Sequence, residues 1–295
     1  MRKSNGLRFS GSVHKMIVSV IIPTKNASKT LEKCLKKIDI QEYCSVEKIV
    51  VDNYSKDSTA TIAAACGASV LRYGPERAFQ KNAGARAATG EYIVFIDADM
   101  ELSPGVIEAC VGVAGRGVAV IIPEESFGAN FWARSKVLER RCYRGNDSIE
   151  AARFFHRDDF FALGGFDEDL VASGEDLDLS QRARRSGFEF RRVEPLIMHD
   201  EGSPTPWETF VKWRYYGRNM AKYWARNPSE ARAQYNPLRR GWLQNWRALV
   251  SSPHLTAGFL FLKACQLAGV LLGVIDSRLG RADRLGDPHA YRVQP

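Results

Sequence analysis

Acidic and amide side chains stand directly after three apolar segments of the chain. Asp97 and Asp99 flank an alanine after the run VFI, and residues 23–26 (PTKN) and 52–57 (DNYSKD) follow two further runs rich in Val and Ile. Two acids on either side of a small residue can present one carboxylate to a hard cation and the other to a sugar or ribose hydroxyl. Mg²⁺ is commonly held by one or two carboxylates together with the phosphates of a substrate. The pattern suits a nucleotide bound with a divalent cation, although such acids also occur in solvated turns.

The elements that must position these side chains are expected to be alternating strands and helices. Ligands of an open parallel sheet bind outside the carboxyl ends of its strands, which is where these polar residues would lie. The apolar periodicity predicts strands at 17–22, 46–51, 69–72, 91–96 and 118–122, with helices at 27–38, 56–66, 77–88 and 104–115. This order predicts an α/β fold with a mostly parallel sheet and flanking helices. The first predicted strand is followed by neither GxGxxG nor a Walker lysine, which argues against a dinucleotide or P-loop site.

The alternation becomes less regular after residue 123. We expect a helix at 127–143, a strand at 151–156, a short helix at 158–163, a helix from Gly174 to about Ser186, strands at 189–192 and 195–199, and helices at 206–226, 238–250 and 255–275. We therefore predict a flexible tail at 1–15, an α/β domain at 16–202 and a helical region at 203–295. The chain is 45% hydrophobic and 11% aromatic, which excludes a disordered or fibrous protein. Its six cysteines lack a spacing suited to zinc, and we expect them to be reduced.

Five sequence motifs occur in an order that resembles one enzyme family. They are PTKN at 23–26, VDNYSKDST at 51–59, KNAGARAATGEYIVFIDAD at 81–99, GGFDE at 164–168 and GED at 174–176. Together they resemble family 2 glycosyltransferases of the GT-A fold, over about residues 16–217. The resemblance implies a Rossmann-like catalytic domain at 16–202 that transfers a sugar from a nucleoside-diphosphate sugar. The ordered set is more specific than any single motif.

The resemblance also implies roles for individual residues. The nucleoside pocket and the donor contacts would comprise Pro23, Thr24, Asn26, Asp52, Lys81, Asn82, Asp97 and Ala98. Asp99 would hold Mn²⁺ or Mg²⁺, and His199, at the end of a predicted strand, would complete the metal site, since imidazole is compatible with Mn²⁺. Ala27 and Asn53 stand where related enzymes often have Glu and Asp, so both GDP-mannose and UDP-sugars remain open as donors.

Glu175 and Asp176 lie at the predicted start of a helix. Ser173 can cap that helix, and acids in its first turn oppose the helix dipole. In the resemblance, Asp176 is the general base that accepts the proton of the acceptor hydroxyl, with Glu175 supporting it or binding the acceptor. The two interpretations coexist, because a helix N-terminus keeps a carboxylate ionised and in place for base catalysis. Only one catalytic carboxylate is evident, which predicts inversion by a single displacement.

The last third of the chain combines aromatic, basic and apolar residues. Five of the six tryptophans fall between residues 207 and 246. Residues 1–200 contain 28 Lys+Arg and 28 Asp+Glu, whereas residues 201–295 contain 14 and 6, so the net charge of +8 arises there. Lys212, within KWRYYG at 212–217, would either neutralise the leaving diphosphate or lie on a solvated basic face.

Residues 255–275 are almost entirely apolar and are long enough to span a bilayer. Thr256, Lys263 and Gln266 would form a narrow polar stripe, which favours a helix in the plane of the membrane or one packed on other helices. Gly269 and Gly273 predict close helix packing. We expect membrane association rather than nucleic-acid binding, with an ordinary buried helix as the alternative.

The resulting hypothesis is an inverting, metal-dependent transferase acting on a hydroxyl of a lipid-linked glycan, peripheral on the cytoplasmic face of the cell membrane. One alternative is a synthase of polyprenyl-phosphate sugars, whose phosphate acceptor is already ionised and needs no base. An alternative of another class is a non-catalytic sugar-nucleotide-binding membrane scaffold. The sequence leaves open the donor sugar, the acceptor and the oligomeric state.

Overall fold

The computed structural model describes residues 16–43, 45–143, 145, 150–170, 174–235, 242 and 245–280. The predicted tail at 1–15, the proposed cap Ser173 and much of the helix expected at 238–250 lie outside these residues.

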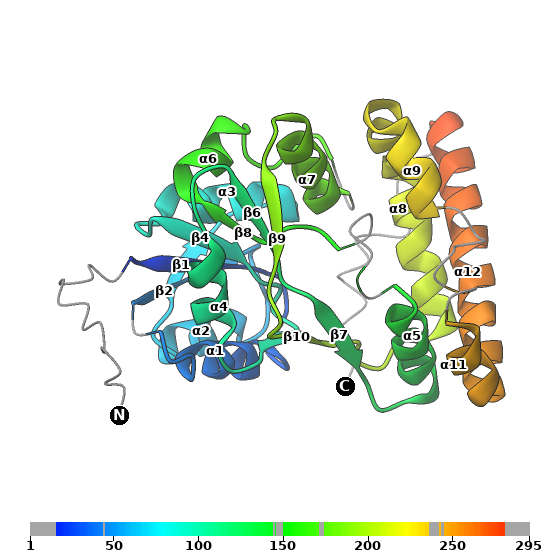
Figure 1. The fold of residues 1–295 in the computed structure, drawn as a ribbon. Coiled ribbons are helices and arrows are strands. Elements are labelled where there is room, and N and C mark those ends of the chain that lie inside the picture. The colour runs from blue at the N-terminus through cyan, green and yellow to red at the C-terminus, as the bar shows by residue number, and fades with distance from the viewer. Residues whose placement is uncertain are drawn as a thin grey trace, which may run out of the picture.

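A seven-stranded sheet forms the centre of the α/β part (Figure 1). Its strand order is β3 (Ser69–Arg72), β2 (Val46–Asp52), β1 (Val18–Thr24), β4 (Tyr92–Phe95), β8 (Phe154–His156), β6 (Val118–Ile121) and β9 (Glu189–Arg192). The pairs β3–β2, β2–β1, β1–β4 and β6–β9 are parallel, and β8 is inserted antiparallel between β4 and β6. The predicted α/β fold with a mostly parallel sheet is confirmed.

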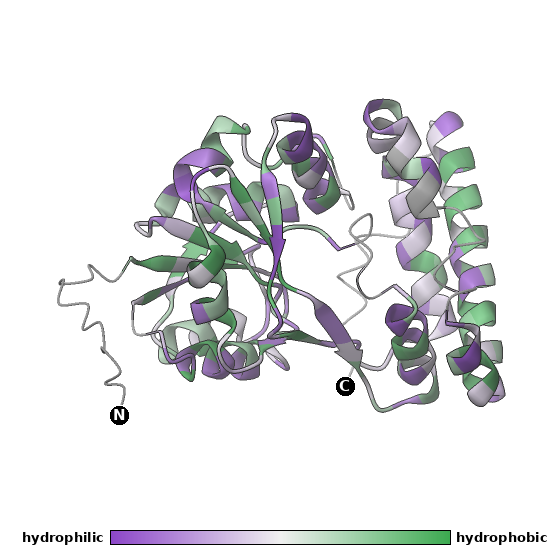
Figure 2. Ribbon diagram, viewed as in Figure 1, coloured by the Kyte–Doolittle hydropathy of each residue, from purple (hydrophilic) through white to green (hydrophobic). Residues whose placement is uncertain are grey.

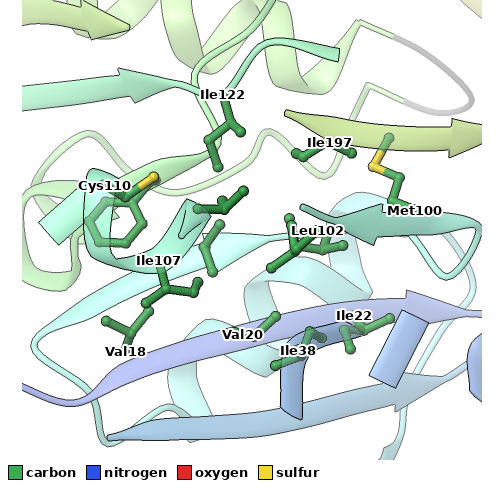
Figure 3. Close-up of a cluster of buried hydrophobic side chains, with 14 of the residues drawn as sticks. Val18, Val20, Ile22, Ile38, Met100, Leu102, Ile107, Cys110, Ile122 and Ile197 are labelled. Carbon is green, nitrogen blue, oxygen red and sulfur yellow. The ribbon is translucent and has the colours of Figure 1, made fainter. Parts of the chain in front are cut away.

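Helices cover both faces of this sheet because its strands are apolar on both sides. The side chains of Val18, Val20 and Ile22 pack with one cluster and that of Ile21 with another. The first cluster includes α1 (Leu31–Asp39), α2 (Thr59–Ala65) and α4 (Val106–Val113), and Figure 3 shows part of it. The second includes α3 (Arg77–Ala87), α6 (Arg157–Ala162) and α7 (Glu175–Arg185).

A second, three-stranded sheet lies beyond the ends of the main strands, in the order β5 (Met100–Leu102), β10 (Ile197–Asp200) and β7 (Glu124–Phe127). Strand β10 is antiparallel to β5 and parallel to β7. The helix expected from residue 127 is therefore wrong at its start. Asn130 caps α5 (Phe131–Arg141) by accepting a 2.7 Å hydrogen bond from the Ala133 amide, so the chain before it is free to form a strand.

The C-terminal region forms a layer of helices beside the α/β part (Figure 1). It contains α8 (Pro206–Arg226), α9 (Pro228–Tyr235), α11 (Trp246–Ser251) and α12 (Pro253–Arg278). A Cβ atom added to Gly273 would lie 2.1 Å from the Arg214 carbonyl oxygen, and one added to Gly269 would lie 2.6 Å from that of Phe210. Only glycine permits such close backbone contact between α8 and α12, which confirms the predicted packing role of the two glycines.

The polar stripe of α12 faces protein rather than solvent or a membrane surface. Lys263 forms an ion pair with Glu139 of α5 and donates a 2.8 Å hydrogen bond to Gln266. Of the two placements predicted from this stripe, the structure shows the helix packed on other helices. The large exposed side chains of α12 are apolar, and Figure 2 shows the hydrophobic colour along the helix. They include Leu260, Phe261, Leu267, Leu271, Leu272 and Ile275.

Candidate active site

The loops after β1 and β2 are tied to each other by side-chain hydrogen bonds. Asp52 accepts a 3.1 Å hydrogen bond from the Ser55 amide, and the Ser55 hydroxyl accepts one of 2.8 Å from the amide of Asn26. The Asn26 side chain accepts a 2.9 Å hydrogen bond from the Lys56 amide, which stabilises its left-handed backbone (φ 49°). The side chains of Asp52 and Asn26 therefore shape the edge of the predicted nucleoside pocket.

Pro23 and Thr24 hold the end of β1 against β2. Pro23 pairs in register with Val51, and the Thr24 carbonyl accepts hydrogen bonds from the Asn53 amide (2.8 Å) and the Gln80 side chain (2.9 Å). Both residues are buried. They form the floor of the same edge, and their contact with a nucleoside stays a prediction.

The Asp97–Asp99 turn is anchored through its central residue. Ala98 is 8% exposed and packs in the main hydrophobic cluster, and the Met100 amide donates a 3.0 Å hydrogen bond to the Asp97 carbonyl. The Ala98 side chain therefore helps to position the turn, and its contact with a donor stays a prediction. The carboxylates diverge, with Asp97 Oδ2 lying 3.8 Å from Arg153 Nη1 and Asp99 Oδ1 lying 3.6 Å from His199 Nε2.

The second sheet brings His199 beside the Asp97–Asp99 turn. His199 pairs with Met100 of β5 and with Ser126 of β7, and its Nδ1 lies 3.6 Å from Glu124 Oε2. Burial alone would lower the pKa of His199, but Asp99 and Glu124 outweigh it and raise that pKa to about 9. Burial would likewise raise the pKa of Glu124, yet the Arg153 guanidinium and His199 hold it well below its ordinary value.

The donor set formed by Asp99 and His199 fits a divalent cation that completes its shell with other oxygens. In the described part of the chain, no three His, Cys, Asp or Glu side chains gather closely enough to hold a metal by themselves. Two protein ligands suffice when substrate phosphates and water supply the rest. Glu124 lies beside Nδ1, the other ring nitrogen of His199. A carboxylate commonly occupies this position beside a metal-binding histidine.

The predicted base lies in a second charged group, around Lys81. Lys81 is fully buried, and its Nζ lies 2.7 Å from Asp176 Oδ1 and 3.3 Å from Glu175 Oε1. The Arg77 Nε lies 3.5 Å from the same Glu175 oxygen. Burial would lower the pKa of Lys81, but the carboxylates of Asp176 and Glu175 raise it. Lys81, expected to contact the donor, thus binds the two acids at the start of α7, whose N-cap is Gly174.

Asn82 holds the loop that follows α6. Its amide group donates to the Phe166 carbonyl (2.8 Å) and to Glu168 (2.9 Å), and its oxygen accepts from the Phe166 amide (2.9 Å). The side chain of Asn82 thus fixes the GGFDE segment, and its contact with the donor stays a prediction. Phe166 in turn packs under Lys81, with Nζ 4.9 Å from its ring centre.

The two charged groups belong to one site. The carboxylates of Asp97 and Asp176 both act on the positive charges of Lys81 and Arg153. Arg153 also donates a 2.9 Å hydrogen bond to Glu124, which lies on His199. The acids expected to bind donor and metal therefore lie on the same side of the sheet as the acid expected to act as base.

Helix α8 closes this site on the side of the C-terminal region. Lys212 Nζ lies 5.6 Å from the ring centre of Tyr216. Burial would raise the pKa of Tyr216, but the positive charges of Lys212 and Arg77 lower it. The neighbouring Tyr215 donates a 2.6 Å hydrogen bond to Glu76 at the start of α3. Tyr216 thus lies near both Lys212 and Arg77, and the predicted role of Lys212 toward a diphosphate stays a prediction.

Three residues of the site were not found from the sequence: Arg77, Glu124 and Arg153. Arg153 stands just before β8 and Glu124 begins β7, so neither carries a local motif. The one signal in the sequence that could have found Glu124 and Arg153 is a charged residue beside an apolar strand-like run. Such residues are common at solvated strand ends. Their role depends on pairing between segments distant in sequence.

Comparison with known proteins agrees with this geometry. Residues 19–167, half of the chain, match the model of the family described as glycosyl transferase family 2. A pre-mycofactocin glycosyltransferase of Mycobacterium tuberculosis is 27% identical over 75% of this chain and 50% of its own length. A GalNAc(5)-diNAcBac-PP-undecaprenol beta-1,3-glucosyltransferase of Campylobacter jejuni is 32% identical over 35% of this chain and 36% of its own length.

The chain thus spans only about a third to a half of the length of these curated relatives. Among solved structures, the mannosyltransferase PcManGT of Pyrobaculum calidifontis, in complex with GDP-Man and Mn²⁺, matches 92% of this chain and 89% of its own with a TM-score of 0.58 at 18% identity. This likeness shows the fold. With the family match over half of its length, the chain belongs to glycosyl transferase family 2.

Proposed function

We propose that this protein is an inverting, metal-dependent transferase that moves a sugar from a nucleoside-diphosphate sugar to a hydroxyl of a lipid-linked glycan. The observation that carries the proposal is the single charged site that joins the Asp97–Asp99 turn and His199 to Asp176 through Arg153 and Lys81. GDP-mannose and UDP-sugars are the candidate donors. Two similar proteins support these substrate classes: the structure of PcManGT is a complex with GDP-Man and Mn²⁺, and the name of the Campylobacter relative includes an undecaprenol-linked acceptor.

The residues of this chain divide the work of a single displacement. Asp97 orients the donor through a hydroxyl, and Lys212 offsets negative charge on the departing diphosphate. When bound at Asp99 and His199, Mn²⁺ or Mg²⁺ supplies further neutralisation of that charge. Lys81 donates to one oxygen of Asp176, and a carboxylate has a second oxygen that can accept the proton of the acceptor hydroxyl. The side chain of Asp176 is 26% exposed, which leaves it accessible to an acceptor.

Removing the base separates this function from its alternatives. We expect Asp176→Asn to lower kcat about 10²- to 10⁴-fold while Mn²⁺-dependent binding of the nucleoside diphosphate, measured by calorimetry, is retained. Asp158→Asn, at an exposed acid on α6, is the matched control. Full activity of Asp176→Asn on a polyprenyl phosphate would instead indicate a polyprenyl-phosphate sugar synthase. Nucleotide binding without turnover of any donor by the unaltered protein would indicate a scaffold.

We further propose that the C-terminal helices, within residues 203–295, attach the enzyme peripherally to the cytoplasmic face of the membrane. The exposed side chains of α12 are apolar, and α12 is, within the described residues, long and apolar enough to cross a bilayer by length and composition. Such a surface is larger than scattered exposed apolar residues and is typical of an interaction site. The excess of 14 basic over 6 acidic residues after position 200 suits anionic lipid headgroups.

A further inference from the structure

A groove with apolar walls lies between the start of α8 and the middle of α12. It is lined by Pro206, Trp207 and Phe210 of α8 and by Ala264, Cys265 and Ala268 of α12, and its volume is about 450 Å³. This volume is within the range of small-ligand sites, roughly 300–1,000 Å³. The Trp207 side chain is 64% exposed and stacks on Phe210 with ring centres 5.4 Å apart. A groove lined only by hydrocarbon, aromatic and thiol groups recognises an apolar chain.

The groove is continuous with the outward apolar face of α12. Ala264 and Ala268 are exposed, and they lie at helical spacing from Leu260, Leu267 and Leu271 of that face. A hydrocarbon chain on this face can therefore enter the groove without crossing a polar surface. Phe210 of α8 and Cys265 of α12 line this open groove from its two helices.

The same helix that lines the groove also reaches the charged site. Phe210 faces the groove, whereas Lys212, two residues later on the opposite side of α8, lies against Tyr216. A rise of about 1.5 Å per residue places Tyr216 only about 9 Å along the helix from Phe210. A molecule with a hydrocarbon chain in the groove can thus extend its head into the active site around α8.

Basic side chains of α5 lie near Lys212. Lys136 and Arg140 of α5 both form ion pairs with Glu201, with Arg140 Nε 3.4 Å from a Glu201 oxygen. Burial lowers the pKa of Lys136, and the nearby charges of Lys212 and Arg140 add to this effect against the opposing charge of Glu201. Lys136 and Lys212 thus lie near enough to each other to share an anionic partner such as a phosphate.

We propose that the groove between α8 and α12 holds the hydrocarbon chain of the lipid-linked acceptor next to its phosphate, with Lys212 and Lys136 facing that phosphate. The inference rests on the proposed function, because it is the proposed function that makes the acceptor a lipid. It adds a chain-binding site outside the family motifs and assigns Trp207 and Phe210 as its aromatic wall.

The test fills the groove without changing the charged site. Ala268→Phe places a ring in the groove, and Ala257→Phe places the same ring on an exposed part of α12 outside it. The probe is 11-bromoundecyl phosphate below its critical micelle concentration, whose bromine quenches tryptophan fluorescence. Comparison with Trp207→Phe isolates the signal of Trp207. We expect saturable quenching in the unaltered protein and in Ala257→Phe, and at least a tenfold weaker apparent affinity in Ala268→Phe.

Kinetics supply a second readout. We expect Ala268→Phe to raise KM for a lipid-linked acceptor at least tenfold and to leave KM for the sugar donor, and for a short acceptor without the lipid, unchanged. The groove would be overturned as a chain site if Ala268→Phe and Ala257→Phe behaved equally in both assays. It would also be overturned if the two variants lost only their flotation with phosphatidylglycerol vesicles and lost it to the same extent. Saturable quenching in a protein that turns over no nucleotide sugar would refute the proposed function while supporting the hydrocarbon site.

Discussion

Arg153 is the residue whose removal tests most directly how the active site is held together. It is 8% exposed, and its Nε donates a 2.9 Å hydrogen bond to Glu124 while Nη1 donates one of 3.4 Å to the Phe95 carbonyl. Its Nη1 also lies 3.8 Å from Asp97. Arg153→Met keeps much of the length of the side chain but removes the charge and these donors.

The expected cost follows from the charge that is left behind. Breaking a buried ion pair by removing one partner costs about 3–5 kcal/mol, because the other charge remains buried and unpaired. Glu124 retains partial exposure, at 22% of its side chain, so we expect the lower end, about 3 kcal/mol. For a domain of this size each kcal/mol lowers Tm by about 2–4 °C, which predicts a fall of roughly 6–12 °C.

Thermal unfolding and Mn²⁺ titration by electron paramagnetic resonance check both parts of this reasoning. Glu124→Gln added to Arg153→Met should recover part of the stability, because the unpaired carboxylate is gone. The double variant should weaken Mn²⁺ binding about 10- to 100-fold, since residue 124 would no longer orient His199 as an ionised partner. Arg191→Met, which removes a 42% exposed arginine beside the exposed Glu189, is the control and should change Tm little, because exposed ion pairs contribute little to stability. A loss for Arg153→Met no larger than the control, or an unchanged Mn²⁺ affinity in the double variant, would refute the reasoning.

Two further predictions concern the framework around the site. Asp57 accepts hydrogen bonds from the amides of Ser28 (3.1 Å) and Thr59 (3.1 Å); burial would raise its pKa, but these bonds lower it. Asp57→Asn should therefore lose about 1 kcal/mol at pH 7, and urea unfolding should show this difference shrinking as the pH falls below the unfolded pKa of about 3.9. A difference that does not change with pH would contradict this reasoning. Gly273→Ala should lower the free energy of unfolding by about 1–3 kcal/mol, because its Cβ would meet the Arg214 carbonyl. Gly112→Ala in α4, with open space at its Cβ, is the control and should be neutral or stabilising by thermal unfolding. Equal Tm values for these two alanine variants would contradict the close packing of α8 on α12.

The α/β part was predictable because its central strands are largely apolar and polar motifs follow β1, β2 and β4. Val18–Thr24 and Val46–Asp52 appear as the parallel neighbours that their composition predicts. The short strands β5 and β7 were missed, since three or four residues with mixed polarity have no periodicity to detect. Without those strands, the sequence could not show why His199 would lie beside Asp99.

By itself the sequence determined which acids stand at the carboxyl ends of the strands, because that order depends only on local apolar runs and the residues that follow them. Tertiary structure decided which charges meet: Lys81 is directed to Asp176, Arg153 to Glu124, and Lys263 inward to Glu139. These pairs join segments far apart in the chain, and a buried charge needs a partner whose identity is set by packing. For the same reason only the assembled helices reveal that the exposed face of α12 is apolar.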